Sequence, residues 1–400
     1  MKNDTRGFVL GVIFEMRLGD GVRVSFSEYS ENETLTPSPP VLFKENEMEK
    51  NIVKRLAVAS LAALTALGMT GCSGSSEKKE SSSDGISGKV VIYTSMYQDI
   101  IDNMKEPLKK KFPDLDIEFF QAGSGTIQSK LAAELDSGKL SCDILMVAEP
   151  SYSMELKEKN VLHAYDYAEK DKLVFDYDKD GYFYPVRVCN MVLAYNPEKY
   201  KKDEVPTSFK AFAEDSSFKG DISMTNPLSS GTAYSAVVSL LDKYGEDYFK
   251  ALGKQDVAIE SGSVALTKLE TGECKAIMVL EESVLKKREE EGSSLEVIYP
   301  EEGSIAIPSN IMIVDGKYSA NNNIKAAEAV EEFFLSPEGQ ELIVKGWMYG
   351  VRSDLSAKPY DGIELADLVK QTLPVDWEKA YKDIEKIRTM FQEYVTIPEK

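Results

Sequence analysis

The sequence has 400 residues and a formal net charge of −20, with 47 lysines and arginines against 67 aspartates and glutamates. No block of lysines and arginines forms a basic stripe, so we expect no nucleic-acid partner. The part that follows Cys72 alone exceeds the length that one compact core supports, which predicts two domains.

Residues 1–47 show no sustained helical or strand periodicity and include the run Thr-Pro-Ser-Pro-Pro. We interpret them as a disordered, mis-assigned leader that precedes a true start at Met48. The dipeptide Lys44-Glu45 favours this interpretation, because it can be encoded by AAGGAG, a strong ribosome-binding sequence. A genuine disordered extension is the alternative.

Residues 48–71 have the organisation of a secretory signal peptide. Basic residues precede LAVASLAALTAL, an uncharged run that is too short for the ~20 apolar residues of a membrane-spanning helix. The sequence MTGC at 69–72 resembles the lipobox of bacterial lipoproteins. The resemblance implies cleavage before Cys72, acylation of that cysteine, and a lipid anchor on the extracytoplasmic face of the cell membrane, in the periplasm if the cell has an outer membrane. A buried helix that ends at a chance cysteine is the alternative.

Residues 72–87 are predicted to form a flexible tether, because this serine-, glycine- and charge-rich segment lacks the apolar surface that folding requires. Three cysteines follow at spacings that match no metal site, namely Cys142, Cys189 and Cys274. We interpret them as small buried apolar residues, with a disulfide between two of them as the alternative.

From residue 88 onward, short apolar runs alternate with amphipathic stretches, which predicts βαβ units and a mainly parallel sheet. In a first block, strands are expected at 88–95, 116–123 and 142–149, and helices at 98–112 and 125–138. In a second block, strands are expected at 220–226, 256–261, 274–281 and 294–300, and helices at 231–245, 263–272 and 283–292.

Two extended apolar segments, FYPVRVCNMVLAYN and SIAIPSNIMIVDG, lie before and after the second block. Two α/β blocks joined by two such segments are typical of a hinged protein with two lobes. The expected order is lobe 1 at 88–185, a hinge strand at 186–196, lobe 2 at 197–300, a second hinge strand at 301–315, and a return to lobe 1 with C-terminal helices at 316–400.

The sequence contains no GxSxG elbow, HExxH zinc motif or GxxxxGK[ST] phosphate loop. Its one histidine, His163, lies in the loop-like VLHAYD and is interpreted as a surface residue. Glu281 and Glu282 suggest an acid–base pair, but adjacent residues on a helix do not face one another. We therefore expect no catalytic residues, no metal, no cofactor and no enzymatic activity.

Two equivalent turns connect a strand to a helix, one in each block. They are Ser124-Gly125-Thr126 and Ser230-Gly231-Thr232. The first N–H groups of a helix lack intrahelical partners and lie at its positive end, and small residues let an anion approach them. The turns therefore predict an anion site, with ordinary N-capping by serine and threonine as the alternative.

Three further features are candidates for the same site. Thr94 and Ser95 end the first strand, and Arg187 lies in the first extended segment among apolar residues. A buried guanidinium needs an anionic partner, which is either a ligand or an internal carboxylate. Glu281, at the end of a strand, could meet an ammonium or hydroxyl group of a ligand, or it could be a solvated residue at a helix start.

From about Gly88 to Asp354 the sequence resembles the type II extracytoplasmic solute-binding proteins of ABC importers, in the branch for ferric iron, phosphonates and phosphorylated sugars. The resemblance rests on VVIYTSM, QAGSGTIQSKLAAE, CDILMVAEP, YPVRVCNMVLAYNPE, NPLSSGTAY, YPEEGSIAIPSNIMIVDG, FFLSPEGQELI and GVRSD. It implies an α/β, periplasmic-binding-protein-like type II fold, with two lobes joined by a two-strand hinge. It also implies a monomer that closes on a small solute and presents it to the permease and ATPase subunits.

The iron-binding members of this family hold Fe(III) through neighbouring tyrosines late in lobe 2, often with a histidine near the first strand. The corresponding stretch here, IMVLEESVLKKREEE, has no tyrosine pair. The resemblance therefore implies a small anionic solute, a phosphonate or an organophosphate such as a sugar phosphate, and a zwitterion or hydroxyl-bearing anion if Glu281 takes part. The expected ligand-binding residues are Thr94, Ser95, Ser124, Gly125, Thr126, Arg187, Ser230, Gly231, Thr232 and Glu281. The alternatives are a ferric iron-binding protein of the same fold, a ligand sensor for a membrane histidine kinase, and an extracytoplasmic hydrolase of phosphorylated compounds.

Overall fold

The computed structural model describes residues 12–15, 23–26 and 85–397. The chain divides into two compact units, residues 1–78 and 79–400. In the first unit, β1 (Val12–Glu15) and β2 (Arg23–Phe26) pair antiparallel. The sequence did not predict these strands, because four residues are too few for a periodicity to register. The predicted signal peptide, Cys72 and the tether as far as residue 84 lie outside the described residues.

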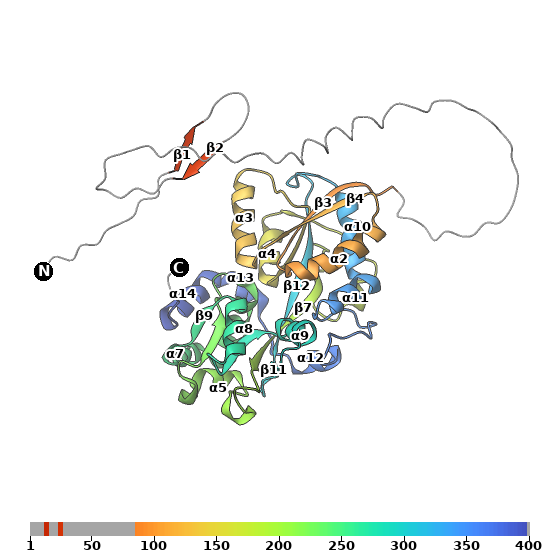
Figure 1. Cartoon of the computed structure of the whole chain (residues 1–400). Helices are drawn as coiled ribbons and strands as arrows, with labels where there is room; N and C mark the ends of the chain where they lie inside the picture. Colours follow the sequence, from red (N-terminus) through yellow and green to blue (C-terminus); the bar gives the residue numbers. More distant parts are fainter. Residues whose placement is uncertain (1–11, 16–22, 27–84, 398–400) are drawn as a thin grey trace, which may run out of the picture. The chain divides into compact units, whose positions relative to one another are not determined.

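Lobe 1 is built on parallel strands with helices on both faces (Figure 1). Strand β3 (Gly88–Thr94) pairs parallel with both β4 (Leu115–Gln121) and β5 (Ile144–Ala148). The other elements of the lobe are β6 (Leu162–His163), α2 (Gln98–Lys111), α3 (Ser124–Asp136), α4 (Pro150–Glu158), α10 (Ile324–Leu335) and α11 (Pro337–Lys345). Because strand side chains alternate, Ile92 packs with α2, α10 and α11 on one face, and Tyr93 packs with α3 and α4 on the other.

Lobe 2 repeats this plan on a second set of parallel strands. Strand β8 (Ile222–Thr225) pairs parallel with β9 (Ala258–Glu260) and β10 (Ala276–Leu280). The other elements are β11 (Glu296–Ile298), α5 (Phe209–Glu214), α6 (Gly231–Tyr244), α7 (Glu246–Lys254), α8 (Gly262–Thr271) and α9 (Glu281–Glu291). The described residues also include short 3-10 helices, η1 (Lys170–Lys172) before β7, and η2 (Lys202–Glu204) and η3 (Ser216–Phe218) in lobe 2.

Two long strands, β7 (Tyr184–Tyr195) and β12 (Ile305–Val314), connect the lobes (Figure 1). They pair antiparallel with each other, from Met191 opposite Ile305 to Tyr184 opposite Ile311. In lobe 2, β7 pairs with β10, and in lobe 1, β12 pairs with β5. Both strands are buried along their whole length, so the two extended segments of the sequence form the two-stranded connection that was predicted.

The C-terminal part of the chain touches both lobes. Helices α10 and α11 return to the core of lobe 1, as the sequence predicts. After α12 (Leu365–Gln371), two short helices, α13 (Trp377–Lys382) and α14 (Ile384–Tyr394), are separated at Asp383. Helix α13 packs on α4 of lobe 1, and α14 packs on α6 and α7 of lobe 2. Within the part of the chain that the structure describes, no helix combines the length and apolar character of a membrane span.

Candidate functional site

A cavity of about 240 Å³ lies between the lobes, against strand β7. Lobe 1 contributes residues from the ends of β3, β4 and β5, and lobe 2 contributes residues from the ends of β8 and β10. The carboxyl ends of parallel strands are the usual location of ligands in open α/β sheets. Five of the ten predicted ligand-binding residues line it: Ser95, Ser124, Arg187, Ser230 and Thr232. We call this cavity the cleft.

The first residues of four helices line the cleft. They are Ser124 of α3, Thr232 of α6, Gly262 of α8 and Glu282 of α9. The positive end of each helix dipole therefore lies at the cavity, which favours a negatively charged ligand, although Ser230 and Ser261 each cap one N–H group of their helix. The turn at α8 was not predicted, although a strand followed by Ser261-Gly262 repeats the pattern of the two predicted turns.

The serines of the two predicted turns have different local roles. Ser230 is the N-cap of α6, and its hydroxyl accepts a hydrogen bond from the N–H of Ala233 at 3.3 Å. The capping interpretation therefore holds at this residue, which also faces the cleft. Ser124 follows the N-cap of α3, and its hydroxyl donates to the carbonyl of Ala148 at 3.2 Å.

The two glycines of these turns bring the lobes together. The N–H of Gly125 in lobe 1 donates to the carbonyl of Ser229 in lobe 2 at 3.3 Å. A Cβ atom at Gly231 would lie 2.4 Å from the carbonyl oxygen of Ala148, so only glycine permits this approach of lobe 2 to lobe 1. Neither glycine lines the cleft, and both lie where the lobes touch beside it.

The structure does not bring Thr94 or Thr126 into the cleft. The Thr94 hydroxyl donates to the carbonyl of Met146 and accepts from the N–H of Met96, both at 3.1 Å, which fixes the turn after β3. Its side chain is fully buried because it points into the lobe, and Ser95 is the residue that faces the cavity. Thr126 is exposed, because the rotation of α3 directs it away from the cavity.

Arg187 of β7 is buried in the wall of the cleft, with 2 % of its surface exposed. Its Nη2 donates to the hydroxyl of Ser95 at 3.2 Å, and its Nη1 contacts the sulfur atoms of Cys189 and Met348. Its Nε has no partner, and the nearest carboxylate oxygen, on Glu282, is 4.0 Å away. A guanidinium carries five N–H donors, so this one is buried with weak acceptors and no close anion.

The sequence placed Glu281 at the ligand and gave Glu282 no role, whereas the structure places Glu282 and not Glu281 in the lining of the cleft. Glu281 lies behind the cleft, where its carboxylate accepts from Asn190 Nδ2 at 2.6 Å and from the hydroxyls of Tyr299 at 2.5 Å and Tyr349 at 2.9 Å. Glu281 is therefore bonded to side chains of the fold and does not line the cleft, and its predicted contact with a ligand stays a prediction. Glu282 lines the cleft instead, because α9 begins at Glu281 and its first turn directs the second residue toward Arg187.

The electrostatic environment of Glu282 is unusual for a carboxylate. Only 3 % of the residue is exposed, and burial raises the pKa of its side chain to about 7, although the charge of Arg187 acts in the opposite direction. Near neutral pH the cleft therefore contains one cation, Arg187, and one carboxyl group that is partly protonated.

Other candidate groups lie away from the cleft or hold no metal. Among residues 85–397, no group of three or more histidine, cysteine, aspartate or glutamate side chains is arranged to hold a metal ion. His163 pairs with Glu328 at 2.8 Å in lobe 1. The three cysteines after residue 85 are free and buried, as predicted from the sequence, and Cys189 lines the cleft.

A larger cavity of about 570 Å³ lies elsewhere, between α4, residues 175–183, β12 and residues 372–377. Its lining contains none of the predicted residues and no arginine. Pro308, Ala306 and Asn310 face it from β12, whereas Ser309 is opposite Arg187 in the register of the hinge strands. The smaller cleft is therefore the candidate site on chemical grounds.

Comparisons with known proteins show the family and the fold. The profile of the family described as bacterial extracellular solute-binding protein matches residues 140–381. A Haemophilus influenzae protein described as uncharacterized is 25% identical over 279 residues, which cover 66% of this chain and 78% of the relative. A sulfate-binding protein of Salmonella typhimurium is 30% identical over 143 residues, which cover 34% of this chain and 43% of the relative.

Two solved structures illustrate the shared fold. The periplasmic binding protein AfuA from Actinobacillus pleuropneumoniae, with exogenous fructose-6-phosphate bound, has a TM-score of 0.67 at 23% identity, covering 78% of this chain and 99% of that one. Iron-bound HitA from Pseudomonas aeruginosa has a TM-score of 0.66 at 19% identity, covering 76% of this chain and 99% of that one.

Proposed function

The chain belongs to the bacterial extracellular solute-binding proteins, and from this premise we propose that it captures a small anionic solute in the cleft. The proposed solute is a phosphonate or an organophosphate such as a sugar phosphate. The lobes close on it about the β7–β12 connection, and the closed form presents it to the permease and ATPase of an ABC importer. The solute is released without chemical change.

The observation that carries this proposal is the buried, incompletely paired guanidinium of Arg187 among four helix N-termini. Removing a guanidinium from water is costly unless an anion compensates it. No carboxylate among the described residues comes closer to it than 4.0 Å, so a ligand oxyanion is the natural partner. Charge-assisted bonds from arginine and from helix N–H groups are the usual means of holding such a group.

The size of the cleft favours a small solute. Its volume of about 240 Å³ lies below the ~300–1,000 Å³ of pockets for drug-sized ligands. A phosphorylated sugar is the guest named for AfuA, which shares this fold, and we extend that class of ligand to this cleft as a proposal.

Ferric iron is the alternative solute, because iron-bound HitA shares the fold. Fe(III) is a hard cation that prefers oxygen ligands. The cleft presents the cation Arg187, the thiol of Cys189, a single carboxyl group, Glu282, and one tyrosine, Tyr97, to a guest, but no tyrosine pair. This set repels a cation and attracts an anion, so we favour the anionic solute.

We also propose that Cys72 carries a lipid anchor that holds the protein at the extracytoplasmic face of the membrane. The support is the MTGC sequence after a short apolar run with a basic flank. Metabolic labelling with an alkyne-tagged fatty acid should mark the wild-type protein and leave Cys72→Ser unlabelled. Equal labelling of both proteins would contradict the anchor.

Thermal unfolding with a panel of solutes tests the proposed ligand class. Glucose 6-phosphate, fructose 6-phosphate, 2-aminoethylphosphonate, phosphate, sulfate and Fe(III)-citrate are compared at equal concentration. A ligand present at 100 times its Kd stabilises the folded state by ~2.7 kcal/mol, which raises the midpoint clearly. Stabilisation by a phosphorylated solute that is lost in Arg187→Met supports the proposal, and stabilisation by Fe(III)-citrate alone contradicts it.

A further inference from the structure

We propose that Glu282 determines the specificity of the cleft, by pairing with a hydroxyl or ammonium group that the ligand carries beside its anionic group. An anion without such a donor is then accepted only when Glu282 itself holds a proton. This inference rests on the proposed capture of an anion in the cleft. It adds the requirement that the solute be an anion with its own permanent hydrogen-bond donor.

Glu282 lies in the cleft beside Arg187. It is the second residue of α9, it is almost fully buried, and its carboxyl group lines the cleft together with Arg187. The closest atoms of the two side chains are 4.0 Å apart, which is too long for a hydrogen bond. A guest that binds Arg187 therefore lies within reach of Glu282 as well.

The neighbours of Glu282 supply fewer hydrogen-bond donors than an ionised carboxylate can accept. From β7 it faces Arg187 and the thiol of Cys189, which is a weak donor, and its own backbone N–H is one further donor. From lobe 1 it faces Tyr97, whose hydroxyl bonds to Ser283 at 3.1 Å. On its own helix Glu281 is adjacent but occupied by donors behind the cleft. An ionised carboxylate accepts up to about four hydrogen bonds, so a guest must supply the missing donors.

An anion that lacks a hydrogen-bond donor should bind weakly while Glu282 is ionised. A donor-free anion beside ionised Glu282 meets like charge and leaves a buried carboxylate unpaired, and both effects weaken binding. Sites built to bond a polar group of their ligand reject analogues that lack it by factors as large as 10⁴–10⁵. Protonation of Glu282 removes both penalties, and burial raises the pKa of this group to about 7. Selectivity should therefore be strong above neutral pH and weak at pH 6.

Three phosphonates of similar size provide the test: 2-aminoethylphosphonate, 2-hydroxyethylphosphonate and propylphosphonate. They differ in whether the terminal group donates a hydrogen bond. At pH 8.5, calorimetry on the wild-type protein should show the amino and hydroxy compounds binding at least about 30-fold more tightly than propylphosphonate. Equal affinity for all three would overturn the inference.

The variant Glu282→Gln removes the charge and supplies a permanent N–H donor at the same place. The advantage of 2-aminoethylphosphonate over propylphosphonate should fall to a few-fold in it. Glu290→Gln, an exposed glutamate on the same helix, is the matched control and should keep the wild-type ratio. An unchanged ratio in Glu282→Gln would overturn the inference.

Sulfate gives a second measurement, which uses only the wild-type protein and so does not depend on whether the variant folds. Sulfate stays fully ionised over the tested range, so a change in its affinity with pH reports a change in the protein. Its affinity for the wild-type protein should fall about tenfold or more between pH 6 and pH 8.5, as the proton on Glu282 is lost. The affinity of 2-hydroxyethylphosphonate should fall much less, and a parallel fall of both would overturn the inference. If none of these anions binds and glucose 6-phosphate also fails to bind, the proposed function itself fails instead.

Discussion

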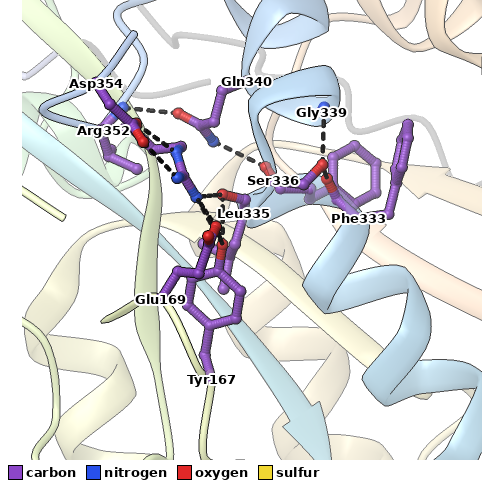
Figure 2. A network of polar contacts seen from close by, with 11 residues as sticks. Tyr167, Glu169, Phe333, Leu335, Ser336, Gly339, Gln340, Arg352 and Asp354 are labelled. Carbon is purple, nitrogen blue, oxygen red and sulfur yellow. Dashed lines mark hydrogen bonds and ion pairs between the residues drawn. The ribbon is translucent and has the colours of Figure 1, made fainter. Parts of the chain in front are cut away.

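Two buried arginines, Arg352 and Arg187, lie in very different surroundings. Every guanidinium nitrogen of Arg352 has a hydrogen-bond partner within the fold, whereas the Nε of Arg187 has none. Arg352 in lobe 1 is 1 % exposed and is fully bonded (Figure 2). Its Nε and Nη2 donate to the two carboxylate oxygens of Asp354, both at 2.8 Å. Its Nη1 donates to the hydroxyl of Tyr167, the carboxylate of Glu169 and the carbonyl of Leu335.

Arg187 has no carboxylate or carbonyl oxygen within hydrogen-bond distance. It has one hydroxyl, two sulfur atoms, a free Nε and a carboxyl group 4.0 Å away. A buried arginine that completes its bonds within the fold stabilises that fold, whereas one that lacks them is available to a guest. The sequence left both outcomes open for Arg187, and the comparison with Arg352 favours the guest.

The largest effect is expected from Arg352→Met, which should lower the free energy of unfolding by about 3 kcal/mol. The loss includes the bonds to Tyr167 and Leu335 and the bidentate pair with Asp354, whose partly exposed carboxylate can regain water. Urea unfolding followed by circular dichroism measures the loss. Arg288→Met, at an exposed pair with Asp361, should cost less than 1 kcal/mol. Similar losses for the two variants would contradict the structural role of Arg352.

Arg187→Met should reverse this pattern. Without ligand its stability should equal or exceed that of the wild type, because a buried and poorly paired charge is replaced by an apolar side chain of similar length. The affinity for the anionic solute should fall by ~2–3 kcal/mol, which is a factor of roughly 30–200. Calorimetry with the best ligand of the thermal panel measures this loss. Normal affinity in this variant would remove Arg187 from the site.

The arrangement of elements was largely predictable from the sequence, because it depends on patterns that extend over many residues. The expected strand at 88–95 and helix at 98–112 correspond to β3 and α2 within one residue at each end. The two long apolar segments became β7 and β12, since only a buried connecting strand carries such a run. The family match and the two-lobed neighbours confirm the resemblance and the fold class that the motifs implied.

The details of the site were less predictable, because they depend on single-residue rotation and on contacts between distant segments. Whether Glu281 or Glu282 faces the cleft depends on where α9 begins, and a shift of one residue rotates the side chain by about 100°. Thr94 and Ser95 differ in the same way at the end of β3, where alternate side chains point to opposite faces. The sequence could not show which of Arg187 and Arg352 has its hydrogen bonds satisfied within the fold, because their partners come from distant segments of the chain.

The pH dependence of the free energy of unfolding tests whether the carboxyl group of Glu282, beside Arg187, is poorly paired. Burial raises its pKa from 4.5 to about 7, so the folded protein keeps a proton that the unfolded chain has released. Its contribution to stability is therefore complete below pH 4.5 and is lost as the pH rises through 7. Between about pH 5.5 and 7.5, the free energy of unfolding of the ligand-free wild type should fall by about 2 kcal/mol relative to Glu282→Gln. Parallel curves for the two proteins would contradict an unpaired carboxyl group in the cleft.

The smallest effect is expected where the lobes touch, because the contact at Gly231 lies between the lobes whereas the bonds of Arg352 lie within lobe 1. Gly231→Ala places a methyl group 2.4 Å from the carbonyl oxygen of Ala148, across the gap between the lobes. Opening relieves this clash, so the stability of the ligand-free protein should hardly change. Closure becomes less favourable, which should weaken ligand binding about five- to tenfold. Lys243→Ala, at an exposed position on the same helix and outside the cleft, should bind normally. Equal affinities of the two variants would show that binding does not require lobe 2 to approach lobe 1 at Gly231.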